Sequence, residues 1–308
     1  MNAWSRRGLL YSPEPGPLWR TSHAANPVAV PSSGGWHVLF SSRDALNRSH
    51  IGALEFSGRD AWSGSASIAS EPLLRPGRPG SFDQHGVSAG CLAQEGRWLF
   101  YLGWNLDGPG KFNNTLGLAI RDETGGFTRA SERPVLDLSE DDPHSLSYPW
   151  VLRRGEDWQL WYGSTVEWLA QGDVRHVIKR AVSRDGQRWQ PTGEVCLEGD
   201  GVHDWALSRP CVLAGANGYR MWFSARGERY RIGYAESEDG VSWSRDDAQW
   251  GLGVGQEPWE DEEVAYPCVY AHEGQLFLFY CGNGYGRTGF GLAVADDPWA
   301  LSSRPTAP

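Results

Sequence analysis

Between Trp205 and Trp243 the chain alternates short apolar runs with turn residues. Apolar side chains at alternate positions over a few residues are typical of β-strands. The stretch therefore predicts three successive strands near 210–213, 219–223 and 232–235. The pair Asp239-Gly240 predicts a tight hairpin into a fourth strand at Trp243, because Gly tolerates positive φ. One such unit is a four-stranded antiparallel meander.

The same unit recurs along the chain, and a proline marks its first strand. Successive landmarks are 62, 60, 61 and 57 residues apart; they are Pro27, Ala89, Pro149, Pro210 and Pro267. A second-strand opener follows nine residues after each landmark, at Trp36, Trp98, Trp158, Tyr219 and Leu276. The third-strand motifs begin at Ile51, Leu116, Ile178, Ile232 and Phe290. Proline is expected at the first residue of each strand, where no ladder hydrogen bond is needed.

A small sheet repeated at this period buries no core alone, but its copies close into a ring when they pack face to face. The sequence therefore predicts an all-β fold, a five-bladed β-propeller with about four antiparallel strands per blade. We expect one domain over 1–308, with blades at roughly 23–75, 83–137, 144–198, 204–255 and 261–298. The last repeat ends soon after its third strand, which leaves it without a fourth, outer strand. Residues 4–17 are expected to supply that strand and close the ring.

Composition narrows the possible partners. The net charge of −10 and the absence of a basic stripe argue against nucleic-acid binding. The sequence has no apolar run of membrane-spanning length and no signal-peptide pattern, so we expect a cytoplasmic protein without a membrane partner. The five cysteines lack metal-ligand spacing and mostly occupy apolar strand positions, which predicts buried free thiols. No cofactor is expected, and the oligomeric state is left open.

Several motifs carry a family resemblance across all five repeats. They are Ala25-Asn26-Pro27, Phe82-Asp83-x-x-Gly86-Val87, Trp161-Tyr162-Gly163, Phe279-Tyr280-x-Gly282 and the Ser-x-Asp-Gly-x-x-Trp hairpins at 183–189 and 237–243. The chain resembles the five-bladed propeller glycoside hydrolases, which include the arabinanase/xylosidase, invertase/levansucrase and mannoside-phosphorylase groups. The resemblance implies a sugar or glycoconjugate ligand near the ring axis, with carboxylates on the inner strands.

The sequence departs from the family pattern where the catalytic carboxylates are expected. Asn26 stands before the first proline, Ser147-Tyr148 before Pro149, and Ser208-Arg209 before Pro210. Glycoside cleavage needs one carboxyl group to protonate the leaving oxygen and a second to attack or to activate water. Either these groups have moved, or the protein is not a standard hydrolase.

If the catalytic acids have moved, we expect them just before the landmark residues. There, every second side chain of an extended strand points to the same face, toward the ring axis. We predict Glu262 as general acid or base, with Asp83 or Asp204 as its partner. Each has a structural alternative: Asp83 as a turn cap, Asp204 as an ion-pair partner of Arg209, and Glu262 as part of a solvated acidic run. His23, His85 and His144 could also hold a metal with Asp83 or Glu262, but no local spacing motif supports this, and no metal is predicted.

The predicted substrate-binding residues are polar or aromatic and lie near strand ends; they are Asn26, Arg43, His85, Trp104, His144, Tyr148, Arg209, Arg226, Tyr266 and Asn283. Three functions remain open. The first is a glycoside hydrolase-like or glycosyl-transferring enzyme with displaced carboxylates. The second is a biosynthetic enzyme for a nucleotide sugar or glycan intermediate, whose phosphate would meet Arg43, Arg209 and Arg226. The third is a non-catalytic carbohydrate-binding propeller.

Overall fold

The computed structural model describes residues 4–14, 16–32, 35–57, 66–106, 111–170 and 173–299. The ends of the predicted domain, 1–3 and 300–308, lie outside them. Three hydrogen-bonded sheets contain nearly all the regular structure, and the only two helices in the described part are single short turns. No described helix has the length and apolar character needed to cross a membrane.

The first sheet joins the two ends of the described chain. It contains β1 (Ser5–Tyr11), β20 (Phe290–Asp296), β19 (Gln275–Cys281) and β18 (Ala265–His272), in that order. Strand β1 is antiparallel to β20, with Ser5 opposite Val294 and Tyr11 opposite Phe290. The helices are α1 (Asp247–Trp250) and α2 (Asn283–Gly286).

Each of the other two sheets consists of two antiparallel meanders. One contains β2 (Ser22–Ser32), β3 (Gly35–Arg43), β4 (Ser49–Ser57), β5 (Ala66–Ile68), β6 (Gly86–Ala93), β7 (Trp98–Trp104), β8 (Thr115–Arg121) and β9 (Phe127–Arg129). The other contains β10 (Ser145–Arg154), β11 (Asp157–Trp168), β12 (Val174–Ser183), β13 (Gln190–Leu197), β14 (Ala206–Gly215), β15 (Gly218–Arg226), β16 (Tyr230–Ser237) and β17 (Ser244–Arg245). In each sheet a single parallel residue pair links the two meanders, Ser49 with Gly86 and His176 with Ala206.

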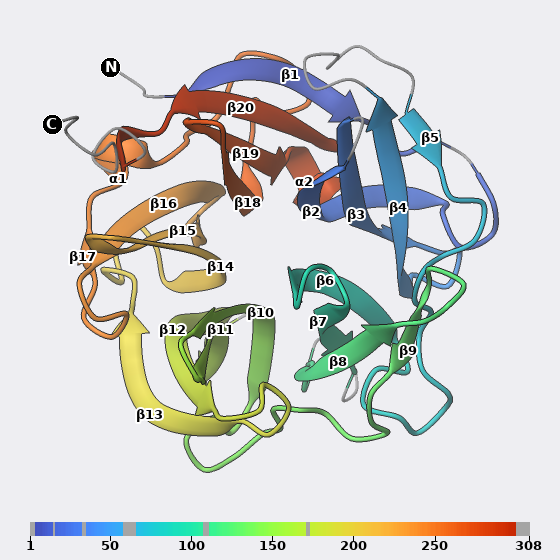
Figure 1. Ribbon diagram of the computed structural model, residues 1–308, viewed down its shortest axis with the longest axis horizontal. Coiled ribbons are helices and arrows are strands. Elements are labelled where there is room, and N and C mark those ends of the chain that lie inside the picture. Colours follow the sequence, from blue (N-terminus) through green and yellow to red (C-terminus); the bar gives the residue numbers. More distant parts are fainter. Residues whose placement is uncertain are drawn as a thin grey trace, which may run out of the picture.

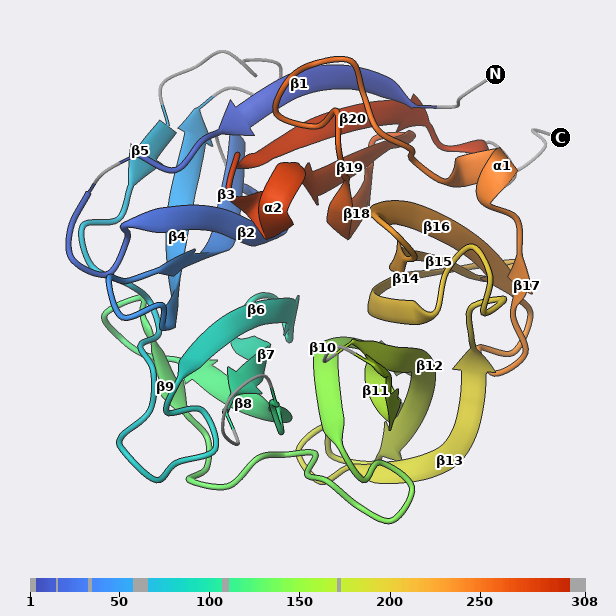
Figure 2. The same ribbon diagram turned by 180° about the vertical axis from the view of Figure 1, so that it is seen from behind.

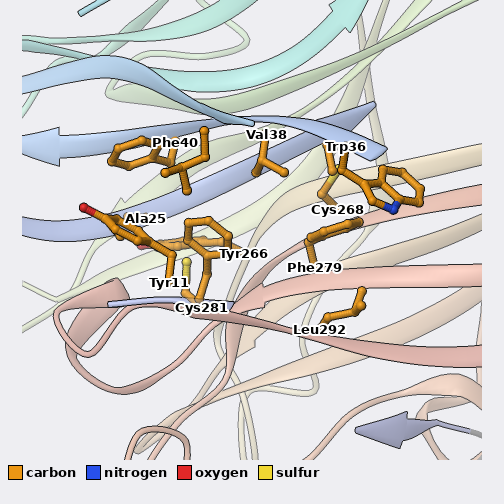
Figure 3. Close-up of a cluster of buried hydrophobic side chains, with 14 of the residues drawn as sticks. Tyr11, Ala25, Trp36, Val38, Phe40, Tyr266, Cys268, Phe279, Cys281 and Leu292 are labelled. Atoms are coloured by element: carbon orange, nitrogen blue, oxygen red, sulfur yellow. The ribbon is translucent and has the colours of Figure 1, made fainter. Parts of the chain in front are cut away.

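The first strand of each meander lies nearest the centre of the molecule (Figures 1 and 2). Strand β2 contacts β6, β6 contacts β10, β10 contacts β14, β14 contacts β18, and β18 contacts β2. The sheets therefore surround a common centre. Aromatic side chains fill the space between them, as in the cluster between β1–β3 and β18–β20, where the ring centres of Trp36 and Phe279 are 5.3 Å apart (Figure 3).

The predicted Ser-x-Asp-Gly hairpins form through local hydrogen bonds. The backbone N–H of Gly240 donates to Ser237 Oγ at 2.8 Å, and that of Gly186 donates to Ser183 Oγ at 2.9 Å. The two glycines have φ values of +78° and +70°. A side chain at either position would be strained, which explains why the turn requires glycine.

The landmark prolines lie inside the inner strands, and the expectation that they begin the strands is wrong. The ladder shifts register across Pro27, Pro149, Pro210 and Pro267, and a similar shift occurs at Gly90 in β6. A β-bulge leaves one residue unpaired, so a proline there costs no ladder hydrogen bond. The bulge also interrupts the alternation of side chains between the two faces of the strand. The face of a residue before the landmark therefore does not follow from its spacing to the landmark.

The buried thiols link neighbouring sheets. Cys91 Sγ accepts the backbone N–H of Val151 at 3.2 Å, and Cys211 Sγ accepts that of Val269 at 3.1 Å. Cys281 Sγ accepts the N–H of Asn26 at 3.3 Å. All five cysteines are free and buried, which confirms the prediction from the sequence. Burial raises the pKa of Cys91 to about 12, so this thiol stays protonated.

Candidate functional site

A cavity of about 280 Å³ lies where the inner strands converge. This volume is near the lower end of the range of about 300–1,000 Å³ for small-molecule sites. Its lining includes six of the predicted substrate-binding residues: Asn26, Arg43, Trp104, Tyr148, Arg226 and Tyr266. The structure therefore brings together residues that are more than 200 positions apart in the sequence.

Strained backbone places several of these side chains. Asn26, Tyr148 and Tyr266 directly precede the landmark prolines and have φ values of +52°, +29° and +57°. Positive φ in a non-glycine residue costs about 1–3 kcal/mol and recurs at functional sites. Two further lining residues, His23 and Tyr285, each have a φ of +60°. In β2, β10 and β18 the residue before the proline, at the bulge, thus faces the cavity.

Four tyrosines form one wall of the cavity. The ring centre of Tyr266 is 5.1 Å from that of Tyr148, 5.9 Å from that of Tyr230 and 6.5 Å from that of Tyr285. Burial raises the pKa of Tyr148, although the nearby Arg209 guanidinium opposes this effect. Burial also raises the pKa of Tyr266 and of Tyr230. The phenols of Tyr148, Tyr230 and Tyr266 therefore stay protonated at neutral pH and can donate hydrogen bonds to a ligand.

Arg209 lies beneath this wall and does not line the cavity. It is 1% exposed, and its guanidinium carbon is 5.4 Å from the ring centre of Tyr148. It donates to the carbonyl oxygens of Pro27, at 3.1 Å, and of Ala89. Arg209 therefore ties three inner strands together. The alternative ion pair between Asp204 and Arg209 does not form, because Asp204 binds Arg245.

Two histidines of the lining are neutral at neutral pH. Burial lowers the pKa of His23 to about 4, and the cations of Arg43 and Arg287 add to this effect. Burial also lowers the pKa of His176 to about 4, and His176 Nδ1 lies 3.0 Å from Thr165 Oγ1. The positive charge of the lining therefore comes from arginine.

Among the residues that the structure describes, no aspartate or glutamate lines the cavity. Asp83 is fully buried elsewhere, where it accepts hydrogen bonds from Tyr101 at 3.0 Å and Arg129 at 2.7 Å. Asp204 accepts two from Arg245, at 3.1 and 2.6 Å. Glu262 is exposed and precedes β18, which begins only at Ala265. The structure does not bring the three predicted catalytic residues together.

Asp83 belongs to a contact that repeats around the ring. Asp142 accepts from Tyr162 at 2.8 Å and pairs with Lys179 at 3.2 Å. Glu260 likewise accepts from Tyr280 at 2.7 Å and pairs with Arg6 at 3.1 Å. In each case a buried acid before an inner strand holds a tyrosine of the second strand and a cation. The repeat explains these acids as structural groups.

The remaining predicted residues lie outside the cavity lining. His85 Nδ1 accepts the N–H of Leu106 at 3.0 Å, and the ring centre of His144 is 6.4 Å from that of Trp168. Asn283 Oδ1 accepts the backbone N–H groups of Glu262 and Glu263, each at 3.0 Å. Within the described ranges, no group of three or more His, Cys, Asp or Glu side chains is arranged to hold a metal ion. The alternative histidine site does not assemble there.

Hydrogen bonds connect two carboxylates of the described chain to lining residues. Asp173 accepts from Arg226 and, at 3.0 Å, from Trp205 Nε1. Glu263 Oε1 accepts the backbone N–H of Tyr285 at 2.8 Å. Of the two neighbouring acids before β18, Glu263 and the predicted Glu262, Glu263 is the one whose side chain accepts a hydrogen bond from a lining residue.

Other lining residues were missed although the repeat could have located them. They stand two positions before the third-strand motifs and are Ser49, Asn114, His176 and Tyr230. The third strands begin on the same side of the ring as the bulges of the inner strands. Counting two residues back from the first residue of each third-strand motif identifies these four.

Comparisons with known proteins place the chain in a family. No protein-family model matches it. Two Mycobacterium tuberculosis proteins, "Uncharacterized protein MT1551" and "Uncharacterized protein Rv1502", are 43% identical over 303 residues, covering 96% of this chain and all of each relative. The chain belongs to the family of these two proteins. They come from strains CDC 1551 / Oshkosh and ATCC 25618 / H37Rv.

Solved structures share the fold of this family at low sequence identity. A "Glycoside hydrolase" has a TM-score of 0.73 at 14% identity, covering 98% of this chain and 93% of its own. A member of "the GH130 family of mannoside phosphorylases" has a TM-score of 0.69 at 15% identity, with 97% of each chain covered. A "thermostable family-43 glycoside hydrolase" has a TM-score of 0.63 at 15% identity, with 90% of each covered. The resemblance to the propeller glycoside hydrolases is confirmed at the level of fold.

Proposed function

We propose that this protein is a carbohydrate-active enzyme that binds a sugar or glycoconjugate in the cavity at the centre of the ring. The observation that carries the proposal is the lining itself. Aromatic faces at Trp104, Tyr148, Tyr266 and Tyr285 surround a space that also contains amide and hydroxyl groups. Aromatic rings pack against the apolar faces of sugars, and the polar groups meet sugar hydroxyls. Sharing a fold with glycoside hydrolases supports the proposal without deciding the chemistry.

The ring is proposed to be a single five-bladed propeller domain. Five inner strands, β2, β6, β10, β14 and β18, contact one another in a closed circle. The pairing of β1 with β20 supports the idea that residues 4–17 complete the last blade. A cytoplasmic location and the absence of nucleic-acid and membrane partners remain predictions, which the net charge of −10 supports for nucleic acid.

Acid–base chemistry in this cavity is proposed to depend on Glu263 and Asp173 rather than on the acids predicted from the sequence. Glu263 contacts the backbone of Tyr285, and Asp173 contacts Arg226; both partners line the cavity. Asp83 and Asp204 are instead bound by Arg129 and Arg245, and neither of these arginines lines the cavity. A role for Glu262 remains a prediction that direct comparison with its neighbour can test.

The experiment compares Glu263→Gln with Glu262→Gln as the matched control. Each substitution removes one carboxylate of the same loop and keeps the shape of the side chain. Turnover of a panel of oligosaccharides and aryl glycosides is measured beside binding by calorimetry. A positioned acid or base contributes about 10²- to 10⁴-fold in rate, so Glu263→Gln should lose that much while Glu262→Gln stays near wild type.

The other outcomes separate the alternative functions. Tight sugar binding without turnover by the wild type would support the non-catalytic carbohydrate-binding propeller. Loss of turnover in Glu262→Gln alone would restore Glu262 as the catalytic group. If no sugar or glycoconjugate of the panel binds, the proposed function is wrong.

A further inference from the structure

One side of the cavity carries positive charge that no acidic side chain of the described chain neutralises. Arg43 lines the cavity at the end of β3. Its guanidinium donates to the neutral Asn47 Oδ1 at 3.0 Å and stands 5.4 Å from the ring centre of Trp104. No aspartate or glutamate within the described ranges forms an ion pair with Arg43. Its charge is therefore available to a ligand.

The other arginines differ from Arg43 in this respect. Arg226 also lines the cavity, but it forms an ion pair with Asp173. Arg209 is sealed beneath Tyr148 and donates to main-chain carbonyls. The three arginines suggested as phosphate ligands by the sequence are thus not equivalent. Only Arg43 combines access to the cavity with the lack of an acidic partner.

His23, in the neighbouring strand β2, is also affected by positive charge on this side of the cavity. It is buried and lines the cavity, and the cations of Arg43 and of Arg287, which follows the α2 turn in contact with β2, both act on the imidazole electrostatically. Arg287 is exposed, directly follows α2 and has no ion-pair partner among the described residues. A neutral imidazole beside two cations can donate one hydrogen bond to an oxyanion.

Two buried polar atoms of the cavity lining are unpaired in the part of the chain that the structure describes. They are Oδ1 of Asn26, which is 3% exposed, and Oγ of Ser147, which is 6% exposed; neither atom has a hydrogen-bond partner among the described residues. Buried polar groups are normally paired, so such atoms indicate a ligand or ordered water. The hydroxyl of Ser147 can donate to an acceptor oxygen, and Asn26 Oδ1 can accept from a sugar hydroxyl.

We propose that the ligand of this cavity is an anionic sugar, whose oxyanion is bound by Arg43 with Arg287 and His23 beside it. The inference rests on the proposed function and adds the charge of the substrate. The oxyanion can be the tetrahedral phosphate of a sugar phosphate or the planar carboxylate of a uronic acid. A guanidinium binds either group through charge-assisted hydrogen bonds. The aromatic rings of the lining hold the uncharged part of the sugar.

The test uses calorimetry on the full-length protein with matched ligands. Glucose, mannose and galactose are each titrated as the neutral sugar, the 1-phosphate and the uronic acid, and inorganic phosphate is titrated alone. The variants are Arg43→Gln and Arg287→Gln. Arg153→Gln is the control, because Arg153 also stands over a tryptophan ring, at 5.6 Å from Trp158, and makes one main-chain hydrogen bond outside the cavity.

We expect an anionic derivative to bind at least about tenfold more tightly than its neutral parent. Hydrogen bonds to charged groups are strong enough that Arg43→Gln should weaken anion binding by about 10- to 100-fold while changing neutral-sugar binding little. Arg287→Gln should have a smaller effect, and Arg153→Gln none. Raising salt should weaken binding of the anionic forms only, because salt screens exposed charges.

The outcomes distinguish this inference from the proposed function. Preference for the 1-phosphate or for the uronic acid identifies the source of the oxyanion, and either result supports the inference. If neutral sugars bind as tightly as their anionic forms, or if Arg43→Gln weakens both equally, the inference is wrong and the proposed function stands. If inorganic phosphate binds through Arg43 but no sugar binds in any form, the anion site stands and the proposed function fails.

Discussion

At the scale of single residues, the site is built from side chains whose backbone is strained. Asn26, Tyr148, Arg209 and Tyr266 share one repeat position and positive φ. Three of them line the cavity, and Arg209 supports it from below. This conformation costs free energy, and the surrounding ring must impose it. The same ring buries His23 and His176, whose neutral forms are compatible with the nearby arginines.

Burial of these histidines predicts a specific pH dependence of stability. Their folded pKa of about 4 lies below the unfolded value near 6.5, so the unfolded state binds more protons between these values. Stability should be fully present above pH 6.5 and should fall as pH decreases toward 4, by up to about 3 kcal/mol for each histidine. Denaturant unfolding measured at several pH values checks this expectation.

The matched variants are His176→Gln and His203→Gln. His203 is exposed, and its pairing with Asp200 raises its pKa. His176→Gln should flatten the loss of stability between pH 6.5 and 4, whereas His203→Gln should not. An unchanged slope in His176→Gln would show that this imidazole does not stay neutral in the folded protein.

At the scale of elements, the proline bulges decide which part of the site the sequence could predict. The strand order and the hairpins follow from repeated turn residues such as Asp239-Gly240. Six cavity residues were found because they stand next to a landmark or at a strand end. Strand alternation predicts that Glu262 faces the cavity, but Glu262 does not line it. The alternation is interrupted because the ladder shifts at Pro267 and β18 begins only at Ala265. Proline is tolerated at the first residue of a strand as well as at a bulge, so the sequence alone does not decide between the two.

The cysteine contacts between inner strands give a prediction for Cys91→Ala. The substitution leaves the buried N–H of Val151 without its sulfur acceptor, and an unpaired buried donor costs about 1–3 kcal/mol. Cys196→Ala is the control, since Cys196 is also buried but has no such main-chain hydrogen bond in the described structure. Chemical denaturation should show the larger loss in Cys91→Ala. Equal losses would mean that only side-chain volume matters at these positions.

At the scale of the whole molecule, the structure separates two uses of acidic residues. Asp83, Asp142, Asp204 and Glu260 bind basic side chains within the sheets. The cavity keeps arginines and neutral polar groups but no described carboxylate. The sequence could predict the ring because its repeat is local and regular. It could not assign the acids, because their partners, such as Arg129 for Asp83 and Arg6 for Glu260, lie in other strands.

A carbohydrate is expected to bind in the cavity at the centre of the ring. The decisive experiment is a crystal structure of the protein soaked with the tightest-binding sugar from the calorimetric panel. Sugar density should be enclosed by Trp104, Tyr148 and Tyr266, with any anionic group against Arg43. Sugar density on the outer surface of the sheets, with these side chains free of ligand, would show that the cavity is not the binding site.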